Sequence, residues 1–133
     1  MRYVYVDSCS VIYLIEESPH FSTKARSFFA QNVGAHVCFS PMVRLEVLLH
    51  PLRDGNTSLQ KDYEDLLGSM HLLSITDEIF DHALRLRARY RLKTPDALHL
   101  ATAQHYGCSE FWTNDNRLNE AADSMAVNVF ADI

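Results

Sequence analysis

The stretch Tyr3-Val4-Tyr5-Val6-Asp7-Ser8 decides the fold, because four apolar residues run directly into a carboxylate. A short continuous apolar run of this kind predicts a strand that is buried on both faces of a sheet. Asp7 then lies where the strand ends. Ligands of open α/β sheets bind at the carboxyl ends of the strands, so we expect Asp7 in the floor of a crevice. A helix N-cap is the alternative role for the same residue.

Strands and helices alternate along the rest of the chain. We predict further strands at 35–39, 71–75, 110–113 and 127–130, and helices at 10–17, 22–31, 40–50, 58–67, 76–90, 94–107 and 116–122. Ser40-Pro41 and Thr94-Pro95 each combine a hydroxyl N-cap with a proline at the first helical position. The alternation predicts an α/β protein of three layers, in which a parallel sheet of about five strands is flanked by helices on both faces.

Length and composition indicate one ordinary globular domain, residues 1–133. The apolar fraction of 47% and the charged fraction of 22% are those of a soluble protein. No apolar run approaches the ~20 residues of a membrane span, so no membrane association is expected. The N-terminal residues lack the basic and long apolar regions of a cleavable signal peptide, and the expected location is the cytoplasm.

The formal net charge of −5 argues against a protein that holds nucleic acid by bulk charge. It does not exclude a nuclease, because metal ions bring their own positive charge to an acidic pocket. The three cysteines Cys9, Cys38 and Cys108 form no CxxC pair. We predict that they are reduced thiols, with neither a disulfide nor a zinc site.

Three further acids fit a solvated position less easily than the rest. Glu46 lies within residues 42–49, where six of eight residues are apolar, so it needs a cation or a hydrogen-bond partner, and a pair with Arg44 or another nearby base is the structural alternative. Asp96 falls in the first turn of a predicted helix, where the helix dipole also favours an acid. Asp115 follows a predicted strand as Asp7 does, and a turn or N-cap role would also explain it.

Two acids at strand ends, one at a helix start and one inside an apolar helix can converge on one crevice. Carboxylates gathered there repel one another unless a cation neutralises them. Ligands that are all oxygen favour Mg²⁺ or Mn²⁺ over zinc. The chemistry expected of such a site is hydrolysis of a phosphodiester by a metal-activated water. Periodicity alone does not prove the convergence.

Four segments, taken in order, resemble those of the PIN-domain ribonucleases, and most closely the VapC-like toxins of prokaryotic toxin–antitoxin pairs: VDSCSVIYLIE, SPMVRLEVL, LKTPDALHLATA and FWTNDNRL. TPDALHLATA with the later TND is the most specific part. The resemblance covers nearly the whole chain. It implies a sheet of about five parallel strands with helices on both faces, and a Mg²⁺- or Mn²⁺-dependent endoribonuclease built as a single PIN domain.

The resemblance also carries over individual residues. The four acidic positions of the family, which hold metal and carry catalysis, match Asp7, Glu46, Asp96 and Asp115. Ser8 and Thr113 match small polar positions near the metal. The family further implies a homodimer, an RNA substrate and a small antitoxin protein that blocks the site.

Several other residues have competing interpretations. Asn114, like Ser8 and Thr113, could hydrogen-bond a carboxylate or a phosphate oxygen, and an exposed Arg44 could contact RNA. The bases Arg85, Arg87, Arg89, Arg91 and Lys93 could follow an RNA backbone, but a solvated helix face is favoured. His99, one helical step from Asp96, is interpreted as a hydrogen-bonded core residue rather than a catalytic one.

Two other functions compete with the nuclease. A phosphoryl-transfer domain also places an aspartate after a strand, but the dehalogenase-type pattern needs an acid where Cys9 stands, and the receiver type fits Thr76-Asp77 poorly. A non-catalytic RNA- or protein-binding scaffold of the same fold is the second alternative. The complete set of four acids argues against it.

Overall fold

The computed structural model describes residues 2–16, 21–113, 118–122 and 125–128 of the chain. The strands are β1 (Tyr3–Val6), β2 (His36–Phe39), β3 (His71–Leu72), β4 (Glu110–Thr113) and β5 (Ala126–Asn128). The helices are α1 (Ser8–Ile15), α2 (Ser22–Gln31), α3 (Pro41–Asp54), α4 (Thr57–Gly68), α5 (Asp77–Tyr90), α6 (Thr94–His105) and α7 (Asn119–Ala122). No helix among the described residues is long and apolar enough to cross a membrane.

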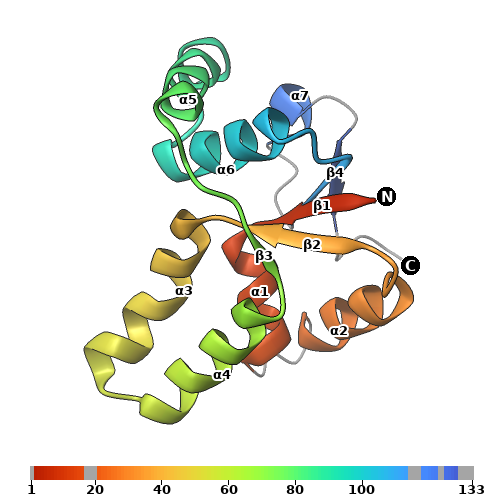
Figure 1. Ribbon diagram of the computed structural model, residues 1–133, viewed down its shortest axis with the longest axis vertical. Helices are drawn as coiled ribbons and strands as arrows, with labels where there is room; N and C mark the ends of the chain where they lie inside the picture. The colour runs from red at the N-terminus through yellow and green to blue at the C-terminus, as the bar shows by residue number, and fades with distance from the viewer. Residues whose placement is uncertain (1, 17–20, 114–117, 123–124, 129–133) are drawn as a thin grey trace.

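The five strands form one sheet in the order β3-β2-β1-β4-β5, and every neighbouring pair is parallel. The prediction of a parallel sheet of about five strands is therefore confirmed. The chain builds outward from β1 to β3 and then crosses back to place β4 on the other side of β1 (Figure 1). The strand order thus reverses at β1 and β4, and the carboxyl ends of strands at such a reversal are where open α/β sheets bind ligands.

Right-handed connections that run in opposite directions across a parallel sheet place their helices on opposite faces. α1 to α4 accordingly pack together on one face, while α5, α6 and α7 pack on the other (Figure 1). α3 and α6 belong to different faces, yet they contact each other. This contact brings together side chains from both layers of helices.

The core lies on both faces of the central strands. Val4, Tyr5 and Val6 of β1 are fully buried, as the apolar run predicted. Phe28 and Phe29 of α2 meet the ring of Trp112 edge-on, with centroids 4.8 and 5.0 Å away, which confirms that they face inward. On the opposite face, all seven residues of α6 from Ala97 to Ala103 are buried.

One helix start and two N-caps differ from the prediction. α1 begins at Ser8 rather than Ser10, because the side chain of Asp7 caps it. For α2 a hydroxyl cap was expected at Ser22 or Thr23, but Phe21 holds the N-cap position, and the Ser22 hydroxyl donates to the carbonyl oxygen of Glu16 at 2.6 Å. For α6 the N-cap is Lys93, which places Thr94 inside the helix. The cap predicted at Ser40 is confirmed, and Thr76 caps α5 in the same way, since each side chain accepts a backbone hydrogen bond.

α3 extends beyond the predicted end at His50, through Pro51 to Asp54. It ends at Gly55, whose φ of 67° is the left-handed conformation that glycine adopts most readily. The strand predicted at 71–75 is shorter and covers only His71 and Leu72. The last predicted strand, 127–130, begins one residue earlier at Ala126, and its final two residues lie outside the described part.

Candidate functional site at the carboxyl edge of the sheet

Asp7 connects β1 to α1 and takes the N-cap role that was the alternative for its position. One carboxylate oxygen, Oδ1, accepts hydrogen bonds from the backbone N–H and from the hydroxyl of Ser10, each at 3.1 Å. These bonds cap α1 and fix the carboxylate at the carboxyl end of the strand. The residue is only 6% exposed. Asp7 is therefore buried at the carboxyl edge of the sheet, where β1 and β4 end side by side.

Burial raises the pKa of Asp7 above its usual range, because an ionised carboxylate is poorly solvated there. Hydrogen bonds from the Thr113 hydroxyl and from Ser10 act in the opposite direction and favour the ion. Thr113 is the buried last residue of β4, and Ser8 is the half-buried first residue of α1. Two of the predicted supporting residues thus stand beside Asp7 in the fold, and a nearby cation would complete the stabilisation of its charge.

Glu46 projects from α3 and is half-buried, with 29% of its side chain exposed. Its Oε1 lies 2.6 Å from Nε2 of His99, which is 53 residues away in sequence. The predicted need for a partner is confirmed, but the partner is this histidine of α6 rather than Arg44, which is exposed. The contact joins α3 to α6 across the edge of the sheet.

His99 is a hydrogen-bonded core residue, as predicted, and it is only 2% exposed. Its Nδ1 lies 2.7 Å from the hydroxyl of Tyr5, which in turn lies 2.8 Å from the hydroxyl of Ser40. It is also close enough to Asp7 to interact electrostatically with that carboxylate. These contacts have no signal in the local sequence pattern, because the three partners come from β1, the end of β2 and α3.

Asp96 lies in the first turn of α6, half-buried and three residues before His99. Residues three apart on a helix share a face, so Asp96 lies one turn nearer the helix start on the side that carries His99. It lines a pocket of about 250 Å³ together with Tyr90, Arg91, Leu92, Lys93 and Leu118. Two bases, Arg91 and Lys93, therefore stand beside this acid.

Asp115 and Asn114, the two remaining predicted site residues, lie outside the described residues. Among the residues that are described, no three His, Cys, Asp or Glu side chains are arranged as a group that could hold a metal ion. Asp7 and Glu46 are each engaged by protein donors instead. The donor chemistry nevertheless fits a hard divalent cation, since the described candidates offer carboxylate oxygens and one of them is a buried acid.

The cysteines do not add ligands to this set. All three are free, and Cys38 and Cys108 are buried. Burial, followed by the carboxylate of Asp7, raises the pKa of the half-buried Cys9 thiol. Cys9 is therefore a neutral thiol in this environment, and none of the three cysteines is in a disulfide in the structure.

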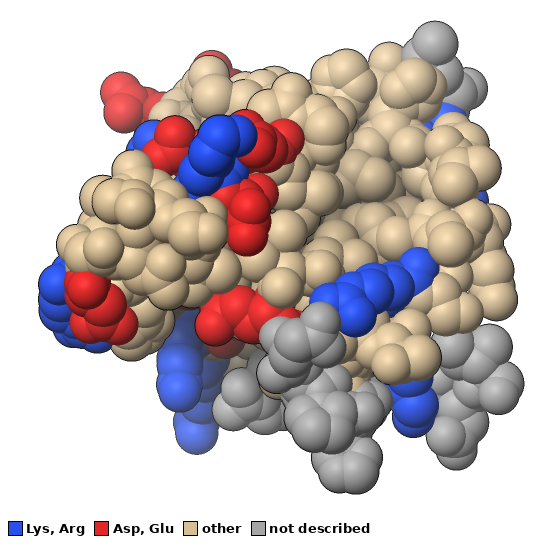
Figure 2. All heavy atoms as spheres, turned by 90° about the horizontal axis from the view of Figure 1, so that it is seen from below, with Lys and Arg blue, Asp and Glu red and all other residues tan. Residues whose placement is uncertain are grey.

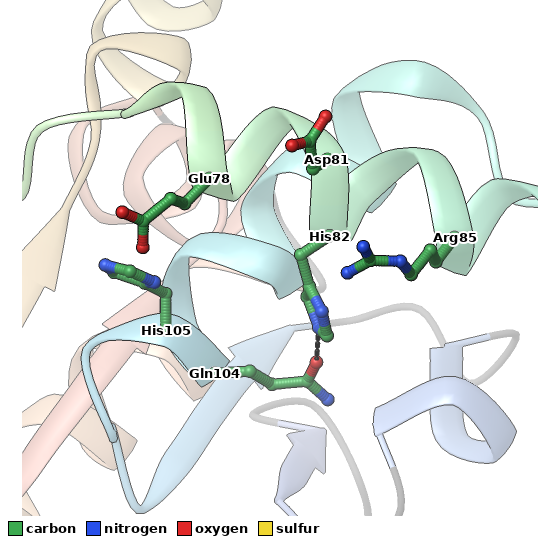
Figure 3. A pocket seen from close by; sticks show the side chains of 6 residues that line it. All are labelled: Glu78, Asp81, His82, Arg85, Gln104 and His105. Atoms are coloured by element: carbon green, nitrogen blue, oxygen red, sulfur yellow. Dashed lines mark hydrogen bonds between the residues drawn. The ribbon is translucent and has the colours of Figure 1, made fainter.

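A second pocket, of about 390 Å³, lies between α5 and α6 and contains none of the predicted site residues. Figure 3 shows Glu78, Asp81, His82 and Arg85 on the α5 side and Gln104 and His105 on the α6 side. Nε2 of His82 lies 2.6 Å from Oε1 of Gln104, so this imidazole is already engaged. The pocket is polar and open, but nothing in it resembles the buried carboxylate at the sheet edge.

Charge is spread rather than concentrated on the face of the molecule that Figure 2 shows. Arg85, Arg87, Arg89, Arg91 and Lys93 are all exposed, which agrees with the solvated face favoured by the sequence. On the face shown in Figure 2, acidic and basic side chains are interspersed and separated by broad uncharged areas. Any nucleic acid would therefore be held by local contacts rather than by a large basic surface.

Comparison with known proteins gives one family. The family model described as PIN domain matches residues 4–124. Ribonuclease VapC46 of Mycobacterium tuberculosis is 29% identical over 133 residues, which is 98% of both chains.

Solved structures share the fold at low sequence identity. A toxin–antitoxin complex from Klebsiella pneumoniae superposes with a TM-score of 0.76 at 21% identity, over 95% of this chain and 97% of the other. VapC20 of Mycobacterium tuberculosis, described as a sarcin–ricin loop cleaving toxin, superposes with a TM-score of 0.75 at 15% identity, over 89% and 94%. These likenesses confirm the three-layer α/β fold.

Proposed function

Because the chain belongs to the PIN domain family, we propose that it is a Mg²⁺- or Mn²⁺-dependent endoribonuclease, the toxin of a toxin–antitoxin pair, and that residues 1–133 form one such domain. The observation that carries the proposal is the buried carboxylate of Asp7 at the reversal of the strand order. A buried carboxylate there destabilises the fold unless its charge is compensated, and a bound cation would compensate it. The relative VapC46 is named a ribonuclease, which supports the same activity.

We assign the metal to Asp7, Asp96 and Asp115, with Glu46 as a further ligand or as the group that orients the attacking water. The cation, when bound, supplies positive charge that lowers the pKa of water and neutralises the scissile phosphate. The protein's own contribution is orientation. Ser10 and Thr113 hold Asp7 in place, and His99 holds Glu46. Ser8 and Asn114 are proposed to hydrogen-bond a carboxylate or a phosphate oxygen.

The RNA would be held beside Asp96. Arg91 and Lys93 line the same pocket as this acid, so their cationic groups can meet the phosphates that flank the bond to be cut. Arg44 is exposed and lies two residues before Glu46 in α3. It is proposed as a further contact to RNA. An RNA substrate would place the protein in the cytoplasm.

Two protein partners are proposed. An antitoxin that blocks the site is supported by the fold shared with a protein solved in a toxin–antitoxin complex. A homodimer is supported by apolar side chains at least half exposed on two helices, which are Leu45, Leu49 and Leu52 of α3 and Phe80 and Leu84 of α5. The α3 residues follow helical spacing and form one stripe, which is a feature of interaction surfaces.

The proposed activity is tested by RNA cleavage with purified protein in Mg²⁺ or Mn²⁺, with EDTA, and with Asp7→Asn. Asp62→Asn, at an exposed acid of α4, is the matched control. We expect cleavage that needs the metal, persists in the control and disappears in folded Asp7→Asn. Cleavage that is unaffected by EDTA and by Asp7→Asn would refute the assignment. If Asp96→Asn abolishes RNA binding while no form of the protein cleaves RNA, the binding scaffold is favoured instead.

A further inference from the structure

The imidazole of His99 makes more polar contacts than a side chain that only fills the core would need. It lies within the seven buried residues of α6, and both of its ring nitrogens meet polar side chains from other elements. A buried polar ring costs free energy unless its nitrogens are hydrogen-bonded, and an apolar residue of similar size would avoid that cost. The position therefore favours a function beyond filling the core.

The direction of each hydrogen bond follows from the partners. The Ser40 hydroxyl oxygen accepts the backbone N–H of Met42 at 3.2 Å, so its proton is available to the Tyr5 oxygen. The Tyr5 hydroxyl then donates to Nδ1 of His99, which leaves the proton of the neutral ring on Nε2. Nε2–H donates to Oε1 of Glu46. In this order every donor meets an acceptor.

The opposite order fails at the carboxylate. With the proton on Nδ1, the lone pair of Nε2 would stand 2.6 Å from a carboxylate oxygen, and two acceptors cannot share that distance unless Glu46 is protonated. The Ser40 proton would also lose its acceptor among the hydrogen bonds that the structure gives to the described residues. When the ring is neutral, the four side chains thus fix one tautomer of His99.

The chain of hydrogen bonds anchors Glu46 from two sides. Ser40 is the N-cap of α3, the helix that carries Glu46, and Tyr5 belongs to the strand that ends at Asp7. Tyr5 itself cannot shift, because it is fully buried and stacked on Phe111 with ring centroids 5.4 Å apart. The start of α3 and the carboxylate of Glu46 are thereby held in place relative to β1, the strand that leads into Asp7.

We infer that His99 is a positioning residue for the proposed nuclease, which holds Oε1 of Glu46 through Nε2–H and is itself set by Tyr5 and Ser40. The inference rests on the proposed function. Within the described residues, only Oε1 of Glu46 takes part in a hydrogen bond that the structure gives, so the second oxygen is left for the reaction centre. Tyr5 and Ser40 act through His99.

The kinetic test pairs each variant with a control of the same chemistry. Tyr5→Phe removes the hydroxyl that sets His99, and Tyr63→Phe removes another hydroxyl of a fully buried tyrosine, one that donates to Glu16. His99→Gln is paired with His82→Gln, which loses a single contact to Gln104. We expect Tyr5→Phe and His99→Gln to lower kcat by about 10–100-fold with the KM for RNA unchanged, while the controls keep kcat.

The spectroscopic test needs no substrate. The ring ¹⁵N shifts of His99 should report a single Nε2–H tautomer in the wild-type protein and in Tyr63→Phe, and Glu46→Gln, whose amide can either accept from Nε2 or donate to it, should relax that preference. An Nδ1–H ring in the wild type, or kcat values of Tyr5→Phe and His99→Gln no lower than those of their controls, would overturn the inference.

The two proposals fail differently. Wild-type protein that cleaves no RNA with any metal overturns the nuclease function, and the tautomer measurement then still decides whether His99 holds Glu46 as inferred. Normal cleavage by Tyr5→Phe and His99→Gln leaves the nuclease intact and removes only the positioning role.

Discussion

Arg2 holds Glu110 through two hydrogen bonds, from Nε to Oε2 at 2.5 Å and from a terminal guanidinium nitrogen to Oε1 at 2.9 Å. Glu110 opens β4, and Arg2 immediately precedes β1, so the pair joins the amino ends of the two central strands. Glu110 also accepts from the indole N–H of Trp112 at 3.1 Å. This end of the sheet is opposite the candidate site. Here the Glu110 carboxylate is paired with a cation, whereas the Asp7 carboxylate at the other end is buried at a cost.

The pair predicts a dependence of stability on pH. The hydrogen bonds from Arg2 lower the pKa of Glu110 below its usual range. A carboxylate with a lowered pKa stabilises the fold above its unfolded pKa of ~4.3, and this contribution is lost as the pH falls through the folded value. We expect Glu110→Gln to be less stable than the wild type at pH 7 and to lose less stability on acidification.

Urea unfolding at pH 7 and at several values below pH 4 measures this difference. Glu64→Gln, at an exposed glutamate of α4, serves as the control. Equal acid sensitivity in the wild type and in Glu110→Gln would show that the pair contributes nothing to stability.

A second prediction concerns the end of α3. Gly55 has a φ of 67° and no atom within 4 Å of where a Cβ would stand, so only the backbone conformation opposes a side chain there. Gly55→Ala should lower the free energy of unfolding by about 1–2 kcal/mol. Gly68→Ala, at the end of α4 with the same open space and without a positive φ, should instead raise it by about 0.4–1 kcal/mol. Denaturant unfolding of both variants checks the pair, and changes of the same sign would contradict it.

A third prediction concerns Arg91, which has a φ of 58° although it is not glycine. Asparagine tolerates this conformation, so Arg91→Asn should retain the stability of the fold. If RNA passes Asp96 as proposed, the variant should raise the KM for RNA and reduce the slope of log affinity against log salt by about 1. Arg85→Ala, an exposed base on α5, is the comparison. Identical salt slopes for both variants would place the RNA elsewhere.

A fourth prediction concerns the dimer. Leu49 lies in the middle of the exposed α3 stripe, and a charge there should be costly to bury against a second copy. We expect Leu49→Glu to convert a dimer into a monomer in sedimentation experiments. Val33→Glu, at a side chain that is 85% exposed outside this stripe, should leave the association state unchanged. A wild-type protein that sediments as a monomer would refute the dimer itself.

The sequence was sufficient for the features that depend on local pattern. An apolar run that ends in a carboxylate placed Asp7 correctly, and the Ser40-Pro41 cap placed the start of α3. The predicted end of α3 at His50 was wrong, because the helix continues through Pro51 to Asp54. A proline removes one backbone hydrogen bond, and here the buried side chain and the Gly55 cap outweigh that loss.

The contacts between distant elements could not be predicted in the same way. No periodicity links His99 to Glu46 or to Tyr5, which are 53 and 94 residues away. The apolar surroundings of Glu46 did indicate that it needs a partner, but the identity of that partner depends on how α3 and α6 approach each other. Such an approach is a property of the completed sheet and not of either helix.

Because the site needs both α3 and α6, it cannot form on the ribosome before α6 has been synthesised and released from the exit tunnel. A ribosome that has released only the chain up to α5 has exposed Asp7 and Glu46, but Asp96 and His99 are still inside the exit tunnel. β4, which supplies Thr113, emerges later still. Contacts between residues so far apart in sequence form last. The candidate site is therefore incomplete until both α6 and β4 have left the ribosome.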